Sequence, residues 1–192
     1  MKNCEIRCDD ILQVSGISKH QAIQINKDTL FDLFKKADIG FALHQYPCIL
    51  AICAEGISRY PYWVDYIRRM KHRFQIELHC NKHQNYKFLP REKIKSELKK
   101  AIDKIEKTFD CKITTWYPPK GRKGEPEDKD KICEELGIKC FQQKGKVDAK
   151  LWLKNPEKYP HINFHFWHKG QVETINKILC RLKEENLKTG LK

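Results

Sequence analysis

The sequence lacks any run of eighteen apolar residues, so it predicts no membrane-spanning helix. It also lacks the pattern of a secretory leader, because the N-terminus passes directly into a short segment that reads as a strand. No internal repeat and no low-complexity tract is visible. With 40% apolar and 10% aromatic residues, the 192-residue chain is typical of a globular protein. We therefore expect a single domain over residues 1–192.

The cysteines do not form the framework of a secreted, disulfide-bonded protein. There are nine of them, an odd number, and their spacing follows no familiar disulfide pattern. Such usage favours a reducing compartment and free, buried thiols. We therefore expect a cytoplasmic protein.

The charge of the chain is one-sided, with a formal net charge of +13. Most of the excess is lysine that alternates with glutamate along a predicted helix, as in residues 93–107, which is typical of a solvated helix face. No aromatic-studded basic strand or other nucleic-acid motif accompanies it. We expect no specific nucleic-acid binding, whereas attraction to an anionic substrate or surface is compatible with the charge.

The apolar pattern predicts alternating strands and helices. One helix should begin at Asp28, run to about Ala37 and be terminated by Gly40. Residues 12–25 read as loop, and 144–158 fit neither pattern. Alternation of this kind favours a mostly parallel sheet, either open or rolled into a barrel, with functional residues at the carboxyl ends of strands. The predicted strands are 4–8, 47–53, 74–79, 112–117, 138–141 and 161–167, and the other helices are 60–70, 90–109, 128–136 and 171–187.

Two histidines mark the end of the third predicted strand. His79 closes the strand and His83 follows four residues later. Asp10 stands where the first strand should give way to a loop. If these strand ends meet, one carboxylate and two imidazoles can hold a zinc or similar ion and leave positions open for catalysis. The plainer interpretation is a turn at Asp10 and two ordinary polar histidines, because H-x-x-x-H often occurs by chance.

The neighbouring polar residues suggest a hydrolytic reaction at that metal. A bound metal acidifies water and polarises a carbonyl group. Asp9, beside the predicted ligand, is a candidate base for the proton of that water. His165, at the end of a late strand, is a candidate acid for the leaving group, with His168 as its competitor.

These residues together resemble those of the metal-dependent polysaccharide deacetylases with the NodB-homology fold. The resemblance rests on Asp-Asp after the first strand, H-x-x-x-H after the third, Pro-Pro after the fourth and a late-strand histidine, over about residues 4–168. It implies a distorted (β/α) barrel that removes N- or O-acetyl groups from an acetylated carbohydrate. The implied cofactor is a divalent metal, zinc foremost, with cobalt, nickel and manganese as alternatives.

The resemblance also implies a role for each matching residue. Asp9 is the implied base, and Asp10, His79 and His83 are the implied metal ligands. His165 matches the general acid. Two further positions match a motif that orients this acid and lines the acetyl pocket, namely Asp148 and Trp152.

One departure from the family pattern concerns the turn after the fourth strand. The family has Arg-Pro-Pro-Tyr-Gly, whereas this chain has Tyr117-Pro118-Pro119-Lys120-Gly121. The arginine that holds the base is missing, and the sequence identifies no substitute for it. The backbone N–H of Lys120 can still stabilise an oxyanion, and we expect Tyr117, Pro119 and Lys120 to contact the substrate.

Besides a basic nucleic-acid-binding domain, which the net charge alone favours, two functions remain open for such a chain. One is an active deacetylase-like hydrolase, and the other is an inactive carbohydrate-binding protein that keeps the fold and the metal. Asp9 favours activity, because an inactive protein does not need a second aspartate beside the predicted ligand.

Overall fold

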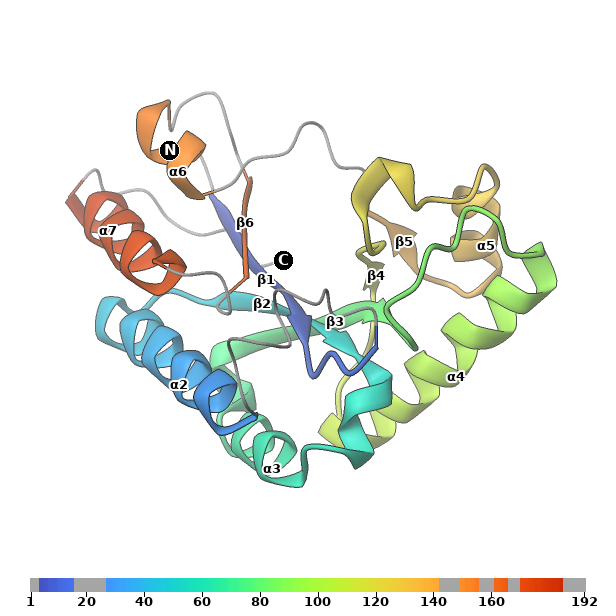
Figure 1. The fold of residues 1–192 in the computed structure, drawn as a ribbon, viewed down its shortest axis with the longest axis horizontal. Helices are drawn as coiled ribbons and strands as arrows, with labels where there is room; N and C mark the ends of the chain where they lie inside the picture. Colours follow the sequence, from blue (N-terminus) through green and yellow to red (C-terminus); the bar gives the residue numbers. More distant parts are fainter. Residues whose placement is uncertain (1–3, 16–26, 142–148, 156–160, 166–169, 185–192) are drawn as a thin grey trace.

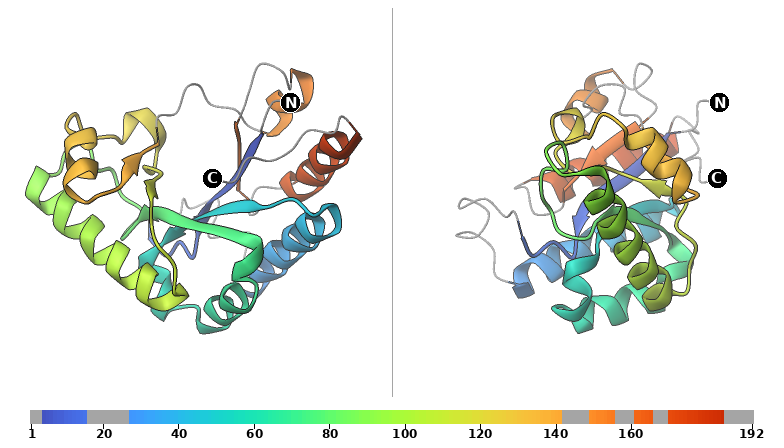
Figure 2. Two further views of the ribbon diagram at one scale, coloured as in Figure 1. Left: turned by 180° about the vertical axis from the view of Figure 1, so that it is seen from behind. Right: turned by 90° about the vertical axis from the view of Figure 1, so that its right-hand side faces the viewer.

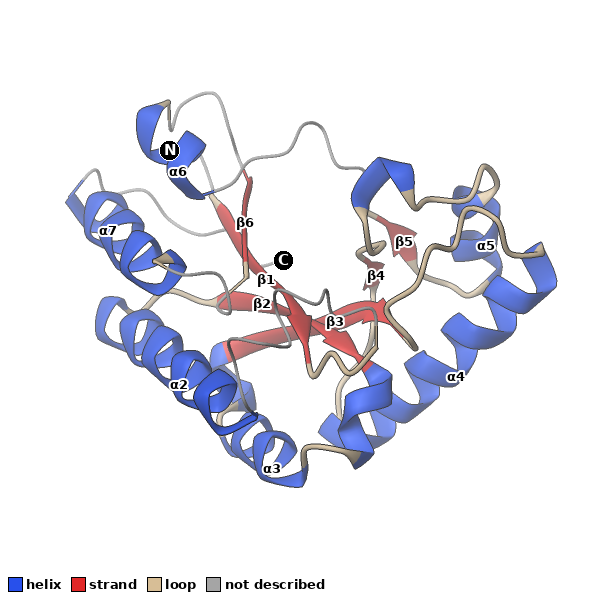
Figure 3. Ribbon diagram, viewed as in Figure 1, coloured by secondary structure: helices blue, strands red, loops and turns tan. Residues whose placement is uncertain are grey.

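The structure is a computed structural model that describes residues 4–15, 27–141, 149–155, 161–165 and 170–184 (Figure 1). The strands of these residues form one parallel sheet in the order β5-β4-β3-β2-β1-β6. The sheet curls into a half-barrel (Figure 3), which confirms the expected (β/α) barrel class. The strands are β1 (Glu5–Ile11), β2 (Cys48–Cys53), β3 (Phe74–Cys80), β4 (Thr115–Trp116), β5 (Lys139–Cys140) and β6 (His161–Phe164).

Helices line the outside of the curled sheet, as the two views of Figure 2 show. Within this layer, α2 packs against α7, and α4 packs against β3. In the described part of the chain, no helix has both the length and the apolar character needed to cross a membrane. The helices are α2 (Lys27–His44), α3 (Pro61–Arg69), α4 (Arg91–Phe109), α5 (Lys129–Glu135), α6 (Ala149–Lys154) and α7 (Gln171–Glu184).

The two faces of the sheet carry different side chains. Successive residues of a strand point to opposite faces, and one set, including Ile6, Leu50 and Leu78, joins the main hydrophobic core. The other set forms a small separate cluster of Ile49, Ala51 and Tyr117, with Phe141 packed against it. Buried polar side chains share this second set on β1 and β3: Arg7, Asp9, Glu77 and His79. The central strands are therefore buried on both faces. The four buried polar side chains just named lie on the face of the small cluster, which is called the inner face below.

The helix predicted to stop at Gly40 continues to His44. A Cβ atom at Gly40 would lie 2.2 Å from Oδ1 of Asn176 on α7. The glycine thus allows a close approach of two helices, and the prediction of a helix end there was wrong. Sequence alone does not reveal that α7 packs at this point.

The strand predicted over residues 112–117 is reduced to Thr115–Trp116. The backbone N–H groups of Thr114 and Thr115 donate to Oε2 of Glu77, at 3.0 and 2.8 Å. A buried carboxylate from β3 therefore takes the place of part of the strand ladder.

Candidate metal centre

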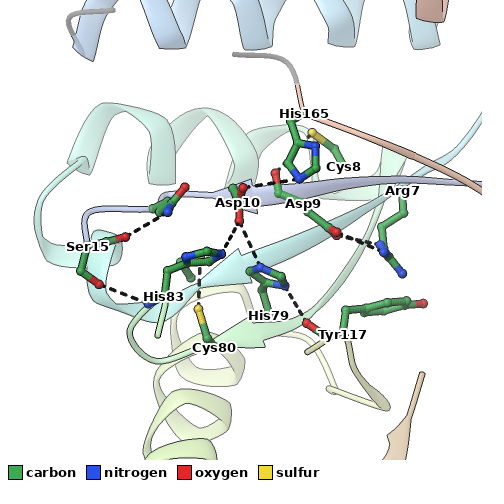
Figure 4. Close-up of polar contacts among 12 residues, drawn as sticks. Arg7, Cys8, Asp9, Asp10, Ser15, His79, Cys80, His83, Tyr117 and His165 are labelled. Carbon is green, nitrogen blue, oxygen red and sulfur yellow. Dashed lines mark hydrogen bonds and ion pairs between the residues drawn. The ribbon is translucent and has the colours of Figure 1, made fainter. Parts of the chain in front are cut away.

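Asp9 and Asp10 lie within β1 and not in the loop predicted for them. Cys8 pairs with Leu50 and Ile11 with Ile52, so two residues of β1 fit in the space of one residue of β2. Asp10 has a φ angle of 62°, in the left-handed region. Such a bulge bends the strand and redirects a side chain, and Asp10 points toward His79 on β3 and His83 beyond it (Figure 4).

His79 lies at a second irregularity, on β3. Ile52 pairs with Leu78 and Cys53 with Cys80, so His79 is the extra residue. Its Nε2 atom is 3.1 Å from Oδ1 of Asp10. Two bulges on strands that flank β2 therefore bring the carboxylate and the imidazole together.

Two more histidines approach the same carboxylate. Nε2 of His83 is 3.2 Å from Oδ1 of Asp10, and Nε2 of His165, which follows β6, is 3.5 Å from Oδ2 (Figure 4). The predicted residues Asp10, His79, His83 and His165 thus converge from three strands. The parallel sheet places their strand ends at one edge.

The ring of His79 is held in one orientation. Its Nδ1 atom is 2.6 Å from the backbone carbonyl of Tyr117. A carbonyl only accepts hydrogen bonds, so Nδ1 carries a hydrogen, and Nε2, which faces Asp10, is the nitrogen that is available to bind a metal once it has lost its proton. Fixing a ligand's tautomer through its other ring nitrogen is the usual arrangement around a metal.

His83 is held through the loop that follows β1. Its backbone N–H donates to Oγ of Ser15, at 3.2 Å. Oε1 of Glu55 accepts from the N–H of Val14, the N–H of Ser15 and the hydroxyl of Ser15, at 3.1, 2.7 and 2.8 Å. Glu55 is the second residue of the 3-10 helix η1 (Ala54–Ser58).

Asp10 and His79 form an ionised pair when no metal is bound. Burial alone raises the pKa of Asp10, but close contacts with His79 and His83 hold that pKa well below its usual range. Burial lowers the pKa of His79, but Asp10, Cys80 and Asp9 together raise it to about 9. Without a metal, the site therefore holds Asp10 as a carboxylate beside a protonated His79.

The donor set fits a divalent metal ion. Oδ1 of Asp10 and Nε2 of His79 are buried and face each other at 3.1 Å. Beyond this contact and that of Oδ1 with His83, neither atom makes a hydrogen bond to any other part of the described residues. One ligand atom from each of Asp10, His79 and His83 lies within 4.8 Å of the others. Ligands that share a zinc ion at about 2.1 Å lie roughly 3.0–3.4 Å apart, which matches the separations from Asp10 to each imidazole.

A second group that meets the same distance limit consists of Cys53, His79 and Cys80. The two sulfur atoms are 3.4 Å apart. Burial and the contact with Cys80 raise the pKa of the Cys53 thiol well above its usual range. A neutral thiol is a poor ligand, so the chemistry of the donor atoms favours the group with Asp10.

Asp9 faces Arg7, two residues earlier on the same strand. Arg7 Nε lies 2.7 Å from Oδ1, and the second guanidinium nitrogen donates to Oδ2 at 3.0 Å. The guanidinium also lies 4.4 Å from the ring centre of Tyr117 and 4.7 Å from that of Phe141. Sequence analysis missed Arg7, although its i, i+2 spacing to Asp9 on a strand puts both side chains on one face.

The other predicted residues are less close to this centre. Tyr117 is buried and contributes its carbonyl to His79, while Pro119 and the exposed Lys120 follow the end of β4. Trp152, on α6, interacts with Cys4 at the amino end of β1, roughly 16 Å along that strand from Asp9. The role of Trp152 in lining the acetyl pocket stays a prediction. Asp148 and His168 lie outside the described residues.

Comparison with known families gives a match over most of the chain. The family model for polysaccharide deacetylases matches residues 26–141. A search of curated proteins finds no significant match to the sequence.

Three solved structures of similar fold are of bacterial proteins. A CE4 family pseudoenzyme from Bacillus anthracis has a TM-score of 0.73 and 16% sequence identity, over 98% of this chain and 63% of that one. A family 4 carbohydrate esterase from Streptomyces lividans, in complex with acetate, has a TM-score of 0.72 and 13% identity, over 99% and 92%. A peptidoglycan deacetylase from Bacillus subtilis has a TM-score of 0.67 and 14% identity, over 98% and 86%. The chain thus spans less than two thirds of the length of the pseudoenzyme.

Proposed function

Because the chain belongs to the polysaccharide deacetylase family, we propose that it is a metal-dependent hydrolase that removes acetyl groups from a sugar or polysaccharide. The observation that carries this proposal is the convergence of Asp10, His79 and His83, with Asp9 adjacent to the ligand. The bond cleaved is an amide or an ester. We further propose a cytoplasmic location, on the ground of the nine cysteines.

Asp10, His79 and His83 would hold the divalent metal, with zinc as the first choice because of its affinity for mixed imidazole and carboxylate ligands. When bound, the metal supplies acidification of water and polarisation of the acetyl carbonyl. The carbonyl of Tyr117 keeps His79 in the tautomer that binding requires. Glu55 and Ser15 keep the loop at His83 in place.

Three further groups complete the proposed reaction. The carboxylate of Asp9 takes the proton from the attacking water. His165, whose Nε2 atom faces Asp10, returns a proton to the leaving group. The backbone N–H of Lys120 donates to the oxyanion, because that role needs no particular side chain. Pro119 and the side chain of Lys120 would lie along the sugar.

The proposal is tested by acetate release from acetylated chito-oligosaccharides with zinc or cobalt present. Asp9→Asn should keep stoichiometric metal and lose at least about a hundredfold in kcat, because it removes a general base. Asp10→Ala and His79→Ala should lose metal, which elemental analysis measures. Unchanged turnover in Asp9→Asn would remove the assignment of the base.

The second candidate is an inactive carbohydrate-binding protein. It is favoured by one observation, the tyrosine at position 117 where the family has arginine. This candidate predicts bound metal and retained sugar affinity, without acetate release from any acetylated sugar in a panel.

A further inference from the structure

Arg7 is a buried cation on the inner face of β1, with about 7% of its side chain exposed. It makes contact with both oxygens of Asp9, at 2.7 and 3.0 Å (Figure 4). A planar guanidinium that binds both oxygens fixes the plane of a carboxylate as well as its charge. Asp9 is therefore held in one orientation beside the predicted metal ligand.

The guanidinium is itself held by two aromatic rings. The rings of Tyr117 and Phe141 lie 4.8 Å apart, and each lies within 5 Å of the guanidinium carbon. Aromatic faces attract a cation, the more so where water is excluded. The side chain of Tyr117 is buried in this contact, so the residue at the family's arginine position supports an arginine that comes from elsewhere.

We propose that Arg7 takes over, from β1, the task of the arginine missing at position 117, and is the positioning residue for the base Asp9. This inference rests on the proposed function. The guanidinium of Arg7 reaches Asp9 from the same strand, and the aromatic ring of Tyr117 packs against that guanidinium. The tyrosine at position 117 is then a partner of the relocated arginine and no mark of an inactive site.

A purely structural role for Arg7 makes a different prediction. If it only neutralised a buried carboxylate, its loss would lower stability and leave turnover of the folded protein unchanged. If it positions the base, its loss lowers kcat, while KM and zinc content stay the same. A guanidinium restored at position 117 should then recover turnover.

The test compares Arg7→Ala, Arg7→Lys and the double variant Arg7→Ala/Tyr117→Arg, each with zinc and acetylated chito-oligosaccharide. Arg7→Ala should lose about a hundredfold in kcat, because a misplaced general base forfeits most of its contribution. Arg7→Lys keeps the positive charge but cannot bind both carboxylate oxygens through a planar guanidinium, so its kcat should lie between those of the wild type and Arg7→Ala. The double variant should exceed Arg7→Ala by at least about tenfold in kcat.

The matched control is Arg73→Lys. Arg73 forms an ion pair with the buried Asp38. Arg73 immediately precedes β3, so it lies at the amino end of that strand, opposite the candidate metal centre. Its kcat should stay within about threefold of the wild type. Thermal unfolding of every variant selects those that are folded, and Arg7→Lys serves if Arg7→Ala does not fold.

The outcomes separate the two proposals. If the wild type releases acetate and folded Arg7→Ala keeps a kcat within about threefold of the wild-type value, the role of Arg7 is overturned while the proposed function stands. Arg7→Lys is used in the same way if Arg7→Ala does not fold. Failure of the double variant to exceed Arg7→Ala would overturn the exchange of positions. A wild type that binds zinc but releases no acetate rejects the proposed function, and the role of Arg7 with it.

Discussion

The ionised pair of His79 and Asp10 should make the metal-free protein sensitive to alkaline pH. His79 has a folded-state pKa of about 9, above its ordinary value of 6.5. A raised pKa contributes stability that is complete below the ordinary value and is lost as pH rises through the folded one. Asp10, with a lowered pKa, keeps its contribution throughout this range.

Urea unfolding with a chelator, at about pH 6.5 and about pH 9.5, should show a loss of the order of 3 kcal/mol in the free energy of unfolding. The matched variant is His79→Asn, which has no group that titrates at that position and should show a smaller loss. Equal pH dependence in both proteins would contradict the assignment to His79.

Glu77 should be a strong determinant of stability although it has no part in the proposed reaction. It is buried and accepts from two backbone N–H groups and from the hydroxyl of Thr114, which donates to Oε1 at 2.6 Å. Glu77→Ala leaves these donors without their partner, at about 3 kcal/mol in the free energy of unfolding. Urea unfolding measures this loss, and Glu134→Ala, an exposed change on α5, should stay within about 0.5 kcal/mol. Similar values for the two variants would contradict the argument.

The residue scale also shows what the sequence hides. The meeting of Asp10 with His79 and His83 could be predicted, because all three residues lie at or just beyond the predicted ends of two strands of a parallel sheet. Arg7 could not, because the predicted strand ended at residue 8 and left Asp9 in a loop, so the i, i+2 spacing of the two residues within β1 was not apparent. The bulge at Asp10 was equally hidden, since it depends on pairing between β1 and β2.

At the scale of elements, strong apolar periodicity predicted β2, β3 and α4 well. The prediction failed where partners from elsewhere decide. The carboxylate of Glu77 shortens β4, and Gly40 lies inside α2 because α7 packs closely against it there. Residues 144–158 fit neither pattern, and α6 forms within them, with Trp152 buried against the amino end of β1.

The contact between η1 and the loop after β1 gives the prediction for this scale. A Cβ atom at Gly56 would lie 1.8 Å from the backbone oxygen of Leu12. Leu12 precedes Ser15, which holds the backbone of His83. Gly56→Ala should therefore displace the loop, with a loss of more than about 2 kcal/mol in the free energy of unfolding and a weaker affinity for zinc.

The control for Gly56→Ala is a second glycine change. Gly137 has a φ angle of 68°, and an added Cβ atom would meet nothing within 4 Å. Gly137→Ala should thus lose about 1 kcal/mol through backbone strain with zinc affinity unchanged. Titration with zinc distinguishes the two, and unchanged affinity in Gly56→Ala would show that the loop does not support His83.

At the scale of the whole molecule, the candidate metal centre joins segments from several strands of the sheet. Asp10 comes from β1 and the histidines from β3 and the loop beyond it, with β2 between them. His165 follows β6, on the other side of β1. A ligand that binds only where these segments meet stabilises the folded state as a whole.

Zinc should accordingly raise the melting temperature of the intact protein. At a free concentration of about 100 times Kd, the free energy of unfolding increases by about 2.7 kcal/mol. For a chain of 192 residues, this corresponds to a shift of roughly 5–11 °C in Tm. Thermal unfolding with zinc and with a chelator measures it, and Asp10→Ala should abolish the shift because it removes the carboxylate that both imidazoles face. A shift of the same size in Asp10→Ala would locate the zinc elsewhere, with the group of Cys53, His79 and Cys80 as the next site to change.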